Sequence, residues 1–300
     1  MTALKNRYDF VFFFDVTNGN PNGDPDAGNM PRLDPDTNHG LVSDVAIKRK
    51  VRDYVMTAHE GEPGHDIYLK NNIVLNEQHE RAYNALGVAP RAKPTRGGLE
   101  ETIQLQKWMC ETFFDIRTFG AVMTTEVNCG QVRGPVQITF ARSVEEITPM
   151  EVSIIRSSVT NRKDRSKGRT MGRKFIVPYG LYCAHGFVNA KLAEKTGFSD
   201  ADLTLLWTAL RDMFELERSA SHGEMVSRQL IAFRHESALG NGRSHELFDL
   251  VKVGRRVGSE VRDIGEARKS AATPARGFAD YEVSVDRGAV PAGVSVLDVF

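Results

Sequence analysis

The chain has 300 residues, and its 39 Lys and Arg balance its 39 Asp and Glu, so the formal net charge is zero. This balance argues against a uniformly basic protein that coats nucleic acid, while 41% hydrophobic residues are enough for a sizeable core. Three cysteines without a Cys-x-x-Cys pair argue against a disulfide framework or a zinc knuckle, so the expected location is a reducing cytoplasm. We expect neither a signal peptide nor a membrane span.

The N-terminal part predicts a buried strand followed by a long loop. Residues 8–17 (YDFVFFFDVT) form a short apolar run bounded by turn residues, which is typical of a buried strand. Residues 18–40 are dense in Asn, Gly, Pro and Asp, which predicts an irregular loop. Loops of this length in compact domains are usually functional or disordered. This loop is therefore a candidate functional segment.

A helix with a basic flank is expected next. Ser43 can cap a helix that runs to about Ala58, because apolar residues recur there at three- and four-residue spacing. Lys48 and Arg52 share one side beside the apolar stripe, and Arg49 lies further round the same side. Such a flank can follow a phosphate backbone, and a solvated amphipathic face is the plain alternative.

The middle of the chain predicts an insertion followed by mixed elements. Residues 60–98 combine Gly, Pro and short apolar pieces with a second basic, proline-containing loop at 89–98. A helix is expected over 99–114. Strands are expected over 118–127 and 134–142, the second with alternating apolar residues.

The C-terminal half contains one clear helix signal. Ser199 and Asp202 form a capping-box pattern before apolar residues at helical spacing. Later strands are expected over 228–235 and 247–253. Strands and helices thus occur in runs rather than in strict alternation, which favours an α+β fold with an antiparallel sheet. No internal repeat or domain boundary is visible, so we expect a single elaborated domain over 1–300.

The stretch 156–174 (RSSVTNRKDRSKGRTMGRK) is strongly basic, with eight Lys or Arg against the single Asp164. Clustered positive charge repels itself unless a polyanion meets it, so this stretch points to nucleic acid. A solvated, disordered loop is the alternative. Strand-like segments at 152–155 and 175–182 favour a loop held by a scaffold. Within it, Met171 is a candidate apolar wedge against displaced bases, or a residue with a packing role.

Catalytic and metal-binding motifs are weak in this sequence. A Walker phosphate loop is absent, because residues 168–174 lack both its glycine spacing and its Ser or Thr after Lys. Aspartates in the long loop could hold magnesium for phosphodiester cleavage, but Asp next to Pro is common turn chemistry. We expect no catalytic residue, no metal and no cofactor. An acidic metal site stays open at Asp24, Asp26, Asp34 and Asp36.

Seven stretches together resemble one protein family. They are residues 20–25 (NPNGDP), 40–52 (GLVSDVAIKRKVR), 114–122 (FDIRTFGAV), 134–137 (GPVQ), 170–174 (TMGRK), 177–182 (VPYGLY) and 233–237 (FRHES). Over nearly its whole length, the chain is similar to the backbone subunit of the type I-C CRISPR Cascade surveillance complex, in the RAMP superfamily. One departure is visible, because His222 precedes Gly-Glu-Met where this pattern has Arg.

The resemblance implies both a fold and a function. The fold would be a modified RRM-like (ferredoxin-like) palm, with a finger-like insertion over 60–113 and a protruding basic thumb region over 156–174. The function would be that of a non-catalytic subunit that polymerises along a CRISPR guide RNA and supports its pairing with target DNA in antiviral defence. The implied partners are the guide RNA (crRNA), target DNA, further copies of the chain in a homo-oligomer and other Cascade subunits, with no membrane involved.

The basic segments and the loop after the first strand together give a set of predicted RNA-binding residues. Cations would contact phosphates, and glycine would let the loop backbone approach closely. Base pairing of the guide would supply sequence specificity. The predicted RNA-binding residues are Asn20, Asn22, Gly23, Lys48, Arg49, Arg52, Arg162, Arg165, Lys167, Arg169, Thr170, Met171, Arg173 and Lys174.

Two other functions stay open. In the related type III effectors, a backbone subunit cleaves target RNA with an Asp in the loop after the first strand. A metal-dependent RNA-cleaving subunit that uses the acidic loop 24–36 is therefore the main alternative. A free single-strand-binding protein is a third possibility.

Overall fold

The computed structural model describes residues 2–92, 98–165, 170–269 and 273–300. Within these ranges, no helix combines the length and the apolar character that a membrane crossing requires. The helices are α1 (Asp44–Ala58), α2 (Leu75–Leu86), α3 (Leu99–Thr112), α4 (Phe114–Phe119), α5 (Ala190–Thr196), α6 (Asp200–Leu216), α7 (Ser244–Phe248) and α8 (Ile264–Lys269).

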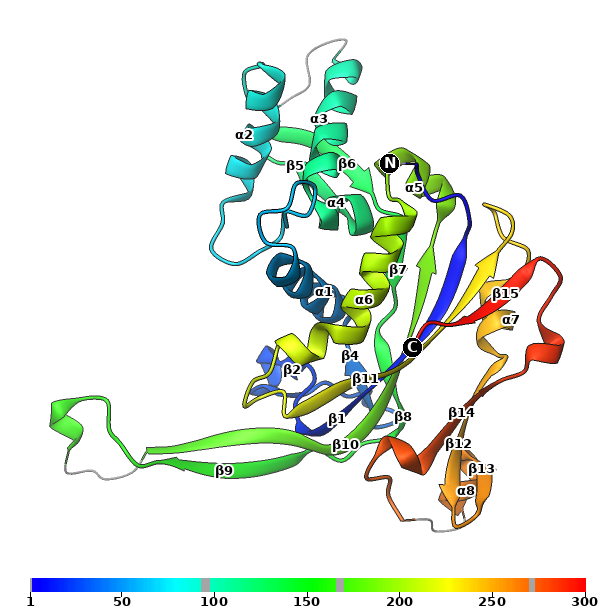
Figure 1. Ribbon diagram of the computed structural model, residues 1–300. Helices are drawn as coiled ribbons and strands as arrows, with labels where there is room; N and C mark the ends of the chain where they lie inside the picture. Colours follow the sequence, from blue (N-terminus) through cyan, green and yellow to red (C-terminus); the bar gives the residue numbers. More distant parts are fainter. Residues whose placement is uncertain (1, 93–97, 166–169, 270–272) are drawn as a thin grey trace.

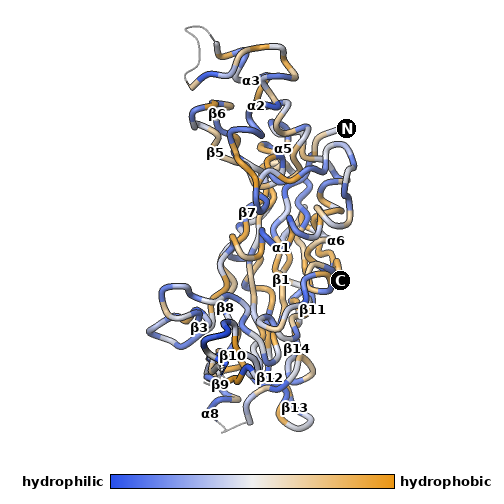
Figure 2. The backbone as a smooth tube through the Cα atoms, turned by 90° about the vertical axis from the view of Figure 1, so that its left-hand side faces the viewer, coloured by the Kyte–Doolittle hydropathy of each residue, from blue (hydrophilic) through white to orange (hydrophobic). Residues whose placement is uncertain are grey.

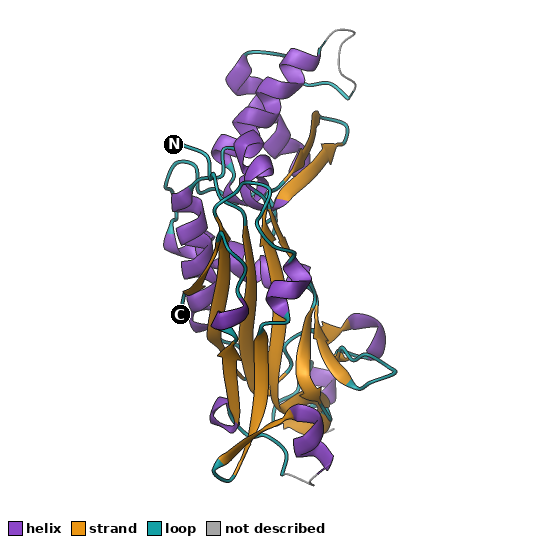
Figure 3. Cartoon of the chain, turned by 90° about the vertical axis from the view of Figure 1, so that its right-hand side faces the viewer, coloured by secondary structure: helices purple, strands orange, loops and turns teal. Residues whose placement is uncertain are grey.

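A large antiparallel sheet forms the centre of the molecule, in the strand order β15-β11-β1-β10-β8-β4 (Figure 3). β1 (Tyr8–Gly19) lies between β10 (Thr170–Val188) and β11 (Glu224–His235), so both of its edges are hydrogen-bonded. The predicted α+β class with an antiparallel sheet is confirmed. The other strands of this sheet are β4 (His39–Val42), β7 (Val136–Ile138), β8 (Ala141–Glu146) and β15 (Val294–Asp298).

Smaller sheets surround the central one. β12 (Val251–Val257) pairs with both β13 (Glu260–Asp263) and β14 (Tyr281–Val285). The shorter pairs are β2 (Gly23–Asp24) with β3 (Met30–Pro31), and β5 (Gly120–Thr124) with β6 (Asn128–Arg133). The β12–β14 sheet lies at one end of the molecule, away from α2 and α3 (Figure 1).

β1 is covered on both of its faces. Phe10, Phe12 and Phe14 belong to one hydrophobic cluster with α1 and α6. Val11 and Phe13 belong to a second cluster with α7, β12 and β14. Alternate side chains of a strand point to opposite faces, so a strand covered on both sides has no polar face and reads as a continuous apolar run. Hydrophobic residues accordingly line much of the chain through the middle of the molecule (Figure 2).

The main elements follow the order β1-α1-β8-β10-α6-β11 along the chain. This β-α-β-β-α-β succession is that of a ferredoxin-like unit. Both helices pack against the same face of the sheet. The order agrees with the predicted RRM-like palm.

Capping explains where the two large helices begin. The Ser43 side chain accepts the backbone N–H of Ala46, which satisfies one free donor at the start of α1. At the start of α6, the Ser199 and Asp202 side chains each accept the other residue's backbone N–H. Both predicted caps are confirmed, and each is worth about 1 kcal/mol of stability.

Helices α2, α3 and α4 and the β5–β6 hairpin share a hydrophobic cluster separate from the sheet. This unit lies at one end of the molecule (Figure 1). The sequence analysis placed an insertion here but did not predict α2. The cluster reaches from Tyr68 to Cys129, so the unit continues past residue 113. Residues 93–97 of the second basic loop lie outside the described ranges.

Three of the predicted strands are wrong in part. Thr118 lies within α4, and β5 starts at Gly120, whose positive φ of 81° ends the helix. The predicted strand 134–142 is divided between β7 and β8. Leu247 lies in α7, and β12 starts four residues later. Short apolar runs do not distinguish a helix from a strand, because periodicity needs a longer window.

The basic stretch is part of a two-stranded arm, residues 150–176. β9 (Met150–Arg156) pairs antiparallel with the first part of β10. From Val177 onward, β10 pairs with β1 instead. The arm is therefore a continuation of a central strand, and it projects away from the body of the molecule (Figure 1).

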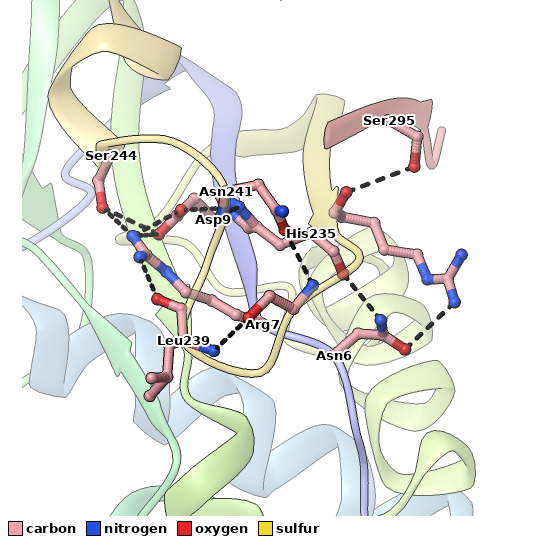
Figure 4. Close-up of polar contacts among 10 residues, drawn as sticks. Asn6, Arg7, Asp9, His235, Leu239, Asn241, Ser244 and Ser295 are labelled. Atoms are coloured by element: carbon pink, nitrogen blue, oxygen red, sulfur yellow. Dashed lines mark hydrogen bonds and ion pairs between the residues drawn. The ribbon is translucent and has the colours of Figure 1, made fainter. Parts of the chain in front are cut away.

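A buried polar network joins the start of β1 to the end of β11 (Figure 4). Asp9 and His235 are both fully buried, and His235 Nε2 donates to Asp9 Oδ2 at 2.8 Å. Arg7 Nη2 donates to the same carboxylate at 2.9 Å, and Ser244 Oγ donates to its other oxygen at 3.1 Å. The Asn241 N–H donates to His235 Nδ1. Within the 233–237 stretch, His235 therefore has a structural role, because it connects β1 to the end of β11.

We expect Asp9→Ala to lower the free energy of unfolding by about 3 kcal/mol, because His235 and Arg7 would lose a buried charged partner. Urea denaturation of the purified chain measures this change. Asp298→Ala is the matched control, because Asp298 pairs with Arg287 on the exposed surface and its loss should change stability little. Equal stability of the two variants would show that the buried network does not stabilise the fold.

Candidate nucleic-acid interface

Four segments meet where β1 ends, and we name their meeting point the junction: residues 19–24, helix α1, residues 217–223 and Lys174. The Asn20 N–H donates to the Ser221 carbonyl at 2.8 Å. Lys174 Nζ, at the base of the arm, donates to the Ala220 carbonyl. Lys50 of α1 pairs with Glu217 at 2.6 Å. The junction therefore links the base of the arm to α1 through the 217–223 segment.

Close packing at the junction explains why glycine occupies position 19. A Cβ added to Gly19 would lie 1.9 Å from the carbonyl oxygen of His222. No side chain fits at that distance, so the 217–223 segment can lie directly on the end of β1 only because residue 19 is glycine.

The loop after β1 is fixed by its own asparagines. Asn20 Nδ2 donates to the Asn29 carbonyl at 2.7 Å, and Asn22 Oδ1 accepts the Ser43 N–H at 2.9 Å. A Cβ on Gly23 would lie 1.9 Å from Asn29 Oδ1, so glycine is needed for packing inside the loop. The Asn20 Oδ1 is buried and has no hydrogen-bond partner within the described chain. Its capacity to accept a hydrogen bond is therefore unused within the described chain.

The basic flank of α1 differs from the predicted one. Arg49 is 64% exposed and lies 3.5 Å from Asp53, but Lys48 is only 12% exposed and pairs with Asp44 at 2.9 Å. Arg52 is 11% exposed and donates to the buried Asp115 at 2.8 Å. The expectation of three cations on an open flank is thus corrected, because only Arg49 is largely open to solvent.

Helix α4 is the reason for this difference. Its Phe119 ring lies 5.7 Å from Lys48 Nζ and 5.4 Å from the Arg52 guanidinium carbon. Its Asp115 also accepts the backbone N–H groups of Tyr68 and Leu69. This side of α1 is therefore covered by a neighbouring helix, which the spacing of cations along α1 cannot reveal.

Two polar residues of the junction were given no role from the sequence. Lys50 is buried against the Phe214 ring and held by Glu217. His222 lies beside this pair, and its pKa is lowered by burial and by the positive charges of Lys50 and Arg49. At neutral pH this histidine is uncharged, so it offers a hydrogen-bonding ring where the resembled pattern has a permanent cation. The sequence does contain a signal for Lys50, because this lysine lies on the side of α1 that is otherwise apolar.

The arm combines open cations with open apolar side chains. Met171 is 72% exposed, and its cross-strand partner Ile155 is 57% exposed. Arg162, Arg165 and Arg173 are exposed as well, and Arg173 lies 3.2 Å from Glu151. Exposed apolar side chains on a projecting hairpin are typical of a binding surface.

The structure leaves part of the predicted set untested. Lys167 and Arg169 lie outside the described residues, and Thr170 is placed only as the first residue of β10. Most of the other predicted residues gather in two places. Those of the loop and Lys174 lie at the junction, Lys48 and Arg52 are covered by α4, and the remainder other than the exposed Arg49 lie along the arm.

Two of the four candidate aspartates of the long loop, Asp24 and Asp34, bind groups of the protein itself. Asp24 accepts the Asp26 N–H at 3.1 Å and lies 3.5 Å from Arg32. Asp34 accepts from Thr37 at 2.8 Å and pairs with Arg142 at 3.1 Å. The Thr37 hydrogen bond and backbone N–H groups hold the pKa of Asp34 below its usual value. These are the contacts of turn-forming carboxylates.

Comparisons with known proteins place the chain in a family. The model of the family described as CRISPR-associated protein Cas7 matches residues 6–286. The CRISPR-associated protein Cas7 of Haloferax volcanii is 28% identical over 292 residues, which cover 88% of this chain and 80% of the relative.

Two chains of RNA-guided complexes are among the solved structures that match this chain. One, from a "CRISPR RNA-guided surveillance complex, pre-nicking", has a TM-score of 0.48 and 16% identity, over 76% of this chain and 75% of that chain. Another, from a "CRISPR RNA-guided surveillance complex", has a TM-score of 0.46 and 15% identity, over 91% and 77%. Because the family model spans most of its length, the chain belongs to the CRISPR-associated protein Cas7 family.

Proposed function

We propose that this chain is the non-catalytic backbone subunit of a type I-C CRISPR RNA-guided surveillance complex. Copies of it polymerise along the guide RNA in the cytoplasm, together with other Cascade subunits, and support pairing of the guide with target DNA. Membership of the Cas7 family supports this proposal. The observation that carries it is the anchored arm, which presents cations and an uncovered apolar pair beyond the body of the molecule.

The junction would bind the sugar-phosphate backbone of the guide. Arg49 supplies the open positive charge on α1, and the buried Asn20 Oδ1 supplies an unused acceptor for a ribose hydroxyl. Phosphate contacts hold register without reading sequence, and base pairing of the guide supplies the specificity. In this proposal Arg52 positions α1 through Asp115, and Lys48 reaches phosphate after leaving Asp44.

The arm would act on the bases and on the neighbouring copy. Met171 and Ile155 form an apolar pair that can lie against a splayed base, while Arg162, Arg165 and Arg173 face phosphates. Stacking on a flat base covers apolar side chains that water otherwise surrounds. The arm projects from the body of the molecule (Figure 1), and in this proposal it contacts a second subunit on the same RNA.

We expect Arg49→Ala to weaken guide-RNA binding uniformly across sequences and to reduce the salt slope by about one, because one phosphate contact is lost. The stability of the Arg49→Ala chain should equal that of the wild type. Arg52→Ala should instead destabilise the fold by about 3 kcal/mol, because the buried Asp115 carboxylate would lose its positively charged partner. Filter binding at several salt concentrations and urea denaturation separate the two effects. An unaltered salt slope in a folded Arg49→Ala chain would remove α1 from the interface.

Met171→Asp should leave a single subunit folded but disrupt regular assembly along RNA, because a charge cannot pack against a base or an apolar partner surface. Met171→Leu should assemble normally, since it keeps an apolar side chain of similar volume. Val122→Asp, at another exposed apolar position, is the control. Native mass measurement and nuclease footprinting on a guide RNA report the outcome. Full-size, evenly spaced complexes of Met171→Asp would show that the arm is merely a solvated hairpin.

The acidic loop separates this proposal from an RNA-cleaving subunit. We expect purified chain with magnesium to leave target RNA and DNA intact, because Asp24 and Asp34 are held by turn and arginine contacts. Gel analysis of labelled substrates tests this. Cleavage by the wild type that disappears in Asp24→Asn or Asp34→Asn would establish the alternative.

A further inference from the structure

Three metal-ligating side chains gather in the turn that follows α1. His59 Nδ1 lies 2.8 Å from Glu62 Oε2, and His65 Nδ1 lies 3.8 Å from the same oxygen. The three ligand atoms all lie within 4.8 Å of one another. Over the described ranges, this is the one such group of His, Cys, Asp or Glu. It lies apart from the junction and from the acidic loop 24–36.

One ligand atom of this group has no hydrogen-bond partner. His65 Nδ1 is buried and makes no hydrogen bond in the described structure. The His59 and His65 rings lie face to face, with centroids 4.9 Å apart and planes inclined by 22°. A buried ring nitrogen without a hydrogen bond is costly, so a ligand that binds it would stabilise the turn. The neighbouring carboxylate and second imidazole favour a cation as that ligand.

The backbone holds these residues in place. Glu62 N–H donates to the His59 carbonyl at 3.1 Å, and His65 N–H donates to the Glu62 carbonyl at 3.2 Å. Gly61 and Gly64 supply the positive φ angles, 76° and 80°, that the two bends require. The spacing of the three side chains therefore follows from a folded turn rather than from chance approach.

A buried ion pair anchors the same turn to the rest of the molecule. Arg117 Nη2 donates to the Gly64 carbonyl at 3.0 Å and to Asp202 at 2.7 Å. Both side chains of this pair are buried. The turn is thus fixed to α4 and α6, which reduces the entropy that binding a metal would otherwise remove.

We propose that His59, Glu62 and His65 form a binding site for a zinc-type divalent metal ion. Two imidazoles and one carboxylate are a common zinc ligand set, with a fourth position left to water. Imidazole nitrogen favours Zn²⁺, Co²⁺ or Ni²⁺, whereas Mg²⁺ and Ca²⁺ prefer oxygen ligands. The site lies at the surface, where water can complete the coordination.

Binding requires a small rearrangement of the side chains. Ligands around tetrahedral zinc stand about 3.3 Å apart, since each bond is ~2.0 Å long. The gap between His65 and Glu62 must close slightly, and the His59 hydrogen bond must open. The metal must also lie in the plane of each ring, so the stacked imidazoles must tilt apart. Both rings are partly exposed, which leaves them room to turn.

The bound ion would connect the end of α1 to the start of the α2–α4 unit. His59 is the C-cap of α1, and His65 directly precedes Asp66, whose carbonyl accepts the Phe114 N–H. The ion would therefore link two parts of the chain. It would stiffen the passage between the helix that carries Arg49 and the unit at the end of the molecule.

Full-length chain freed of metal with a chelator should bind one equivalent of Zn²⁺ in calorimetric titration. Co²⁺ used as a probe should give the intense visible absorption of a tetrahedral site. Glu62→Gln and His65→Ala should each weaken Zn²⁺ binding about tenfold or more, because each removes one ligand. His245→Ala is the matched control, since His245 is an exposed histidine next to a glutamate elsewhere in the chain.

Thermal unfolding provides a second readout. Zn²⁺ should raise the melting temperature of the wild type and of His245→Ala, but not of His65→Ala, since a ligand stabilises only the fold that binds it. Circular dichroism without metal checks that each variant is folded. Zn²⁺ affinity that stays within about threefold of wild type in both Glu62→Gln and His65→Ala would overturn the proposal. The absence of a tetrahedral Co²⁺ spectrum in the wild type would do so as well.

Discussion

The enclosure of β1 is the constraint on which the rest of the structure depends. Helices α1 and α6 cover one face, and α7, β12 and β14 cover the other. β10 and β11 occupy both edges. A simple RRM binds RNA on aromatic side chains of an open sheet face, and this sheet has no such face along β1. Its phenylalanines are core residues, so the candidate binding groups lie at the end of β1 and on the arm that continues β10.

Much of the fold could be predicted because its signals are local. The apolar run of β1, the Ser43 cap of α1 and the capping box of α6 each lie within a few residues. Predictions failed where local signals were weak. α2 has no side-chain cap, and α7 begins without one as well. Such helices are stabilised by packing, as the separate cluster around α2 and α3 shows, and packing is decided by distant parts of the chain.

The segments of the candidate interface were predicted from the sequence, but the partners of their side chains were not. Cation spacing predicted an open basic flank on α1, yet Arg52 is paired with a carboxylate 63 positions away. Lys50 is paired across 167 positions. A pattern within one helix contains no information on such partners. The histidine turn was also overlooked, because its two histidines stand six positions apart and do not match the His-Glu-x-x-His spacing.

The continuity of β10 has a geometric consequence. Its 19 residues span about 60 Å at ~3.3 Å per residue, and they serve first the arm and then the centre of the sheet. Pro178 lies just after the point where β10 changes its partner from β9 to β1. Because proline has no backbone N–H, a bend there breaks no hydrogen bond from that residue. The direction of the arm relative to the sheet is therefore fixed within one strand, β10, and does not depend on a flexible linker.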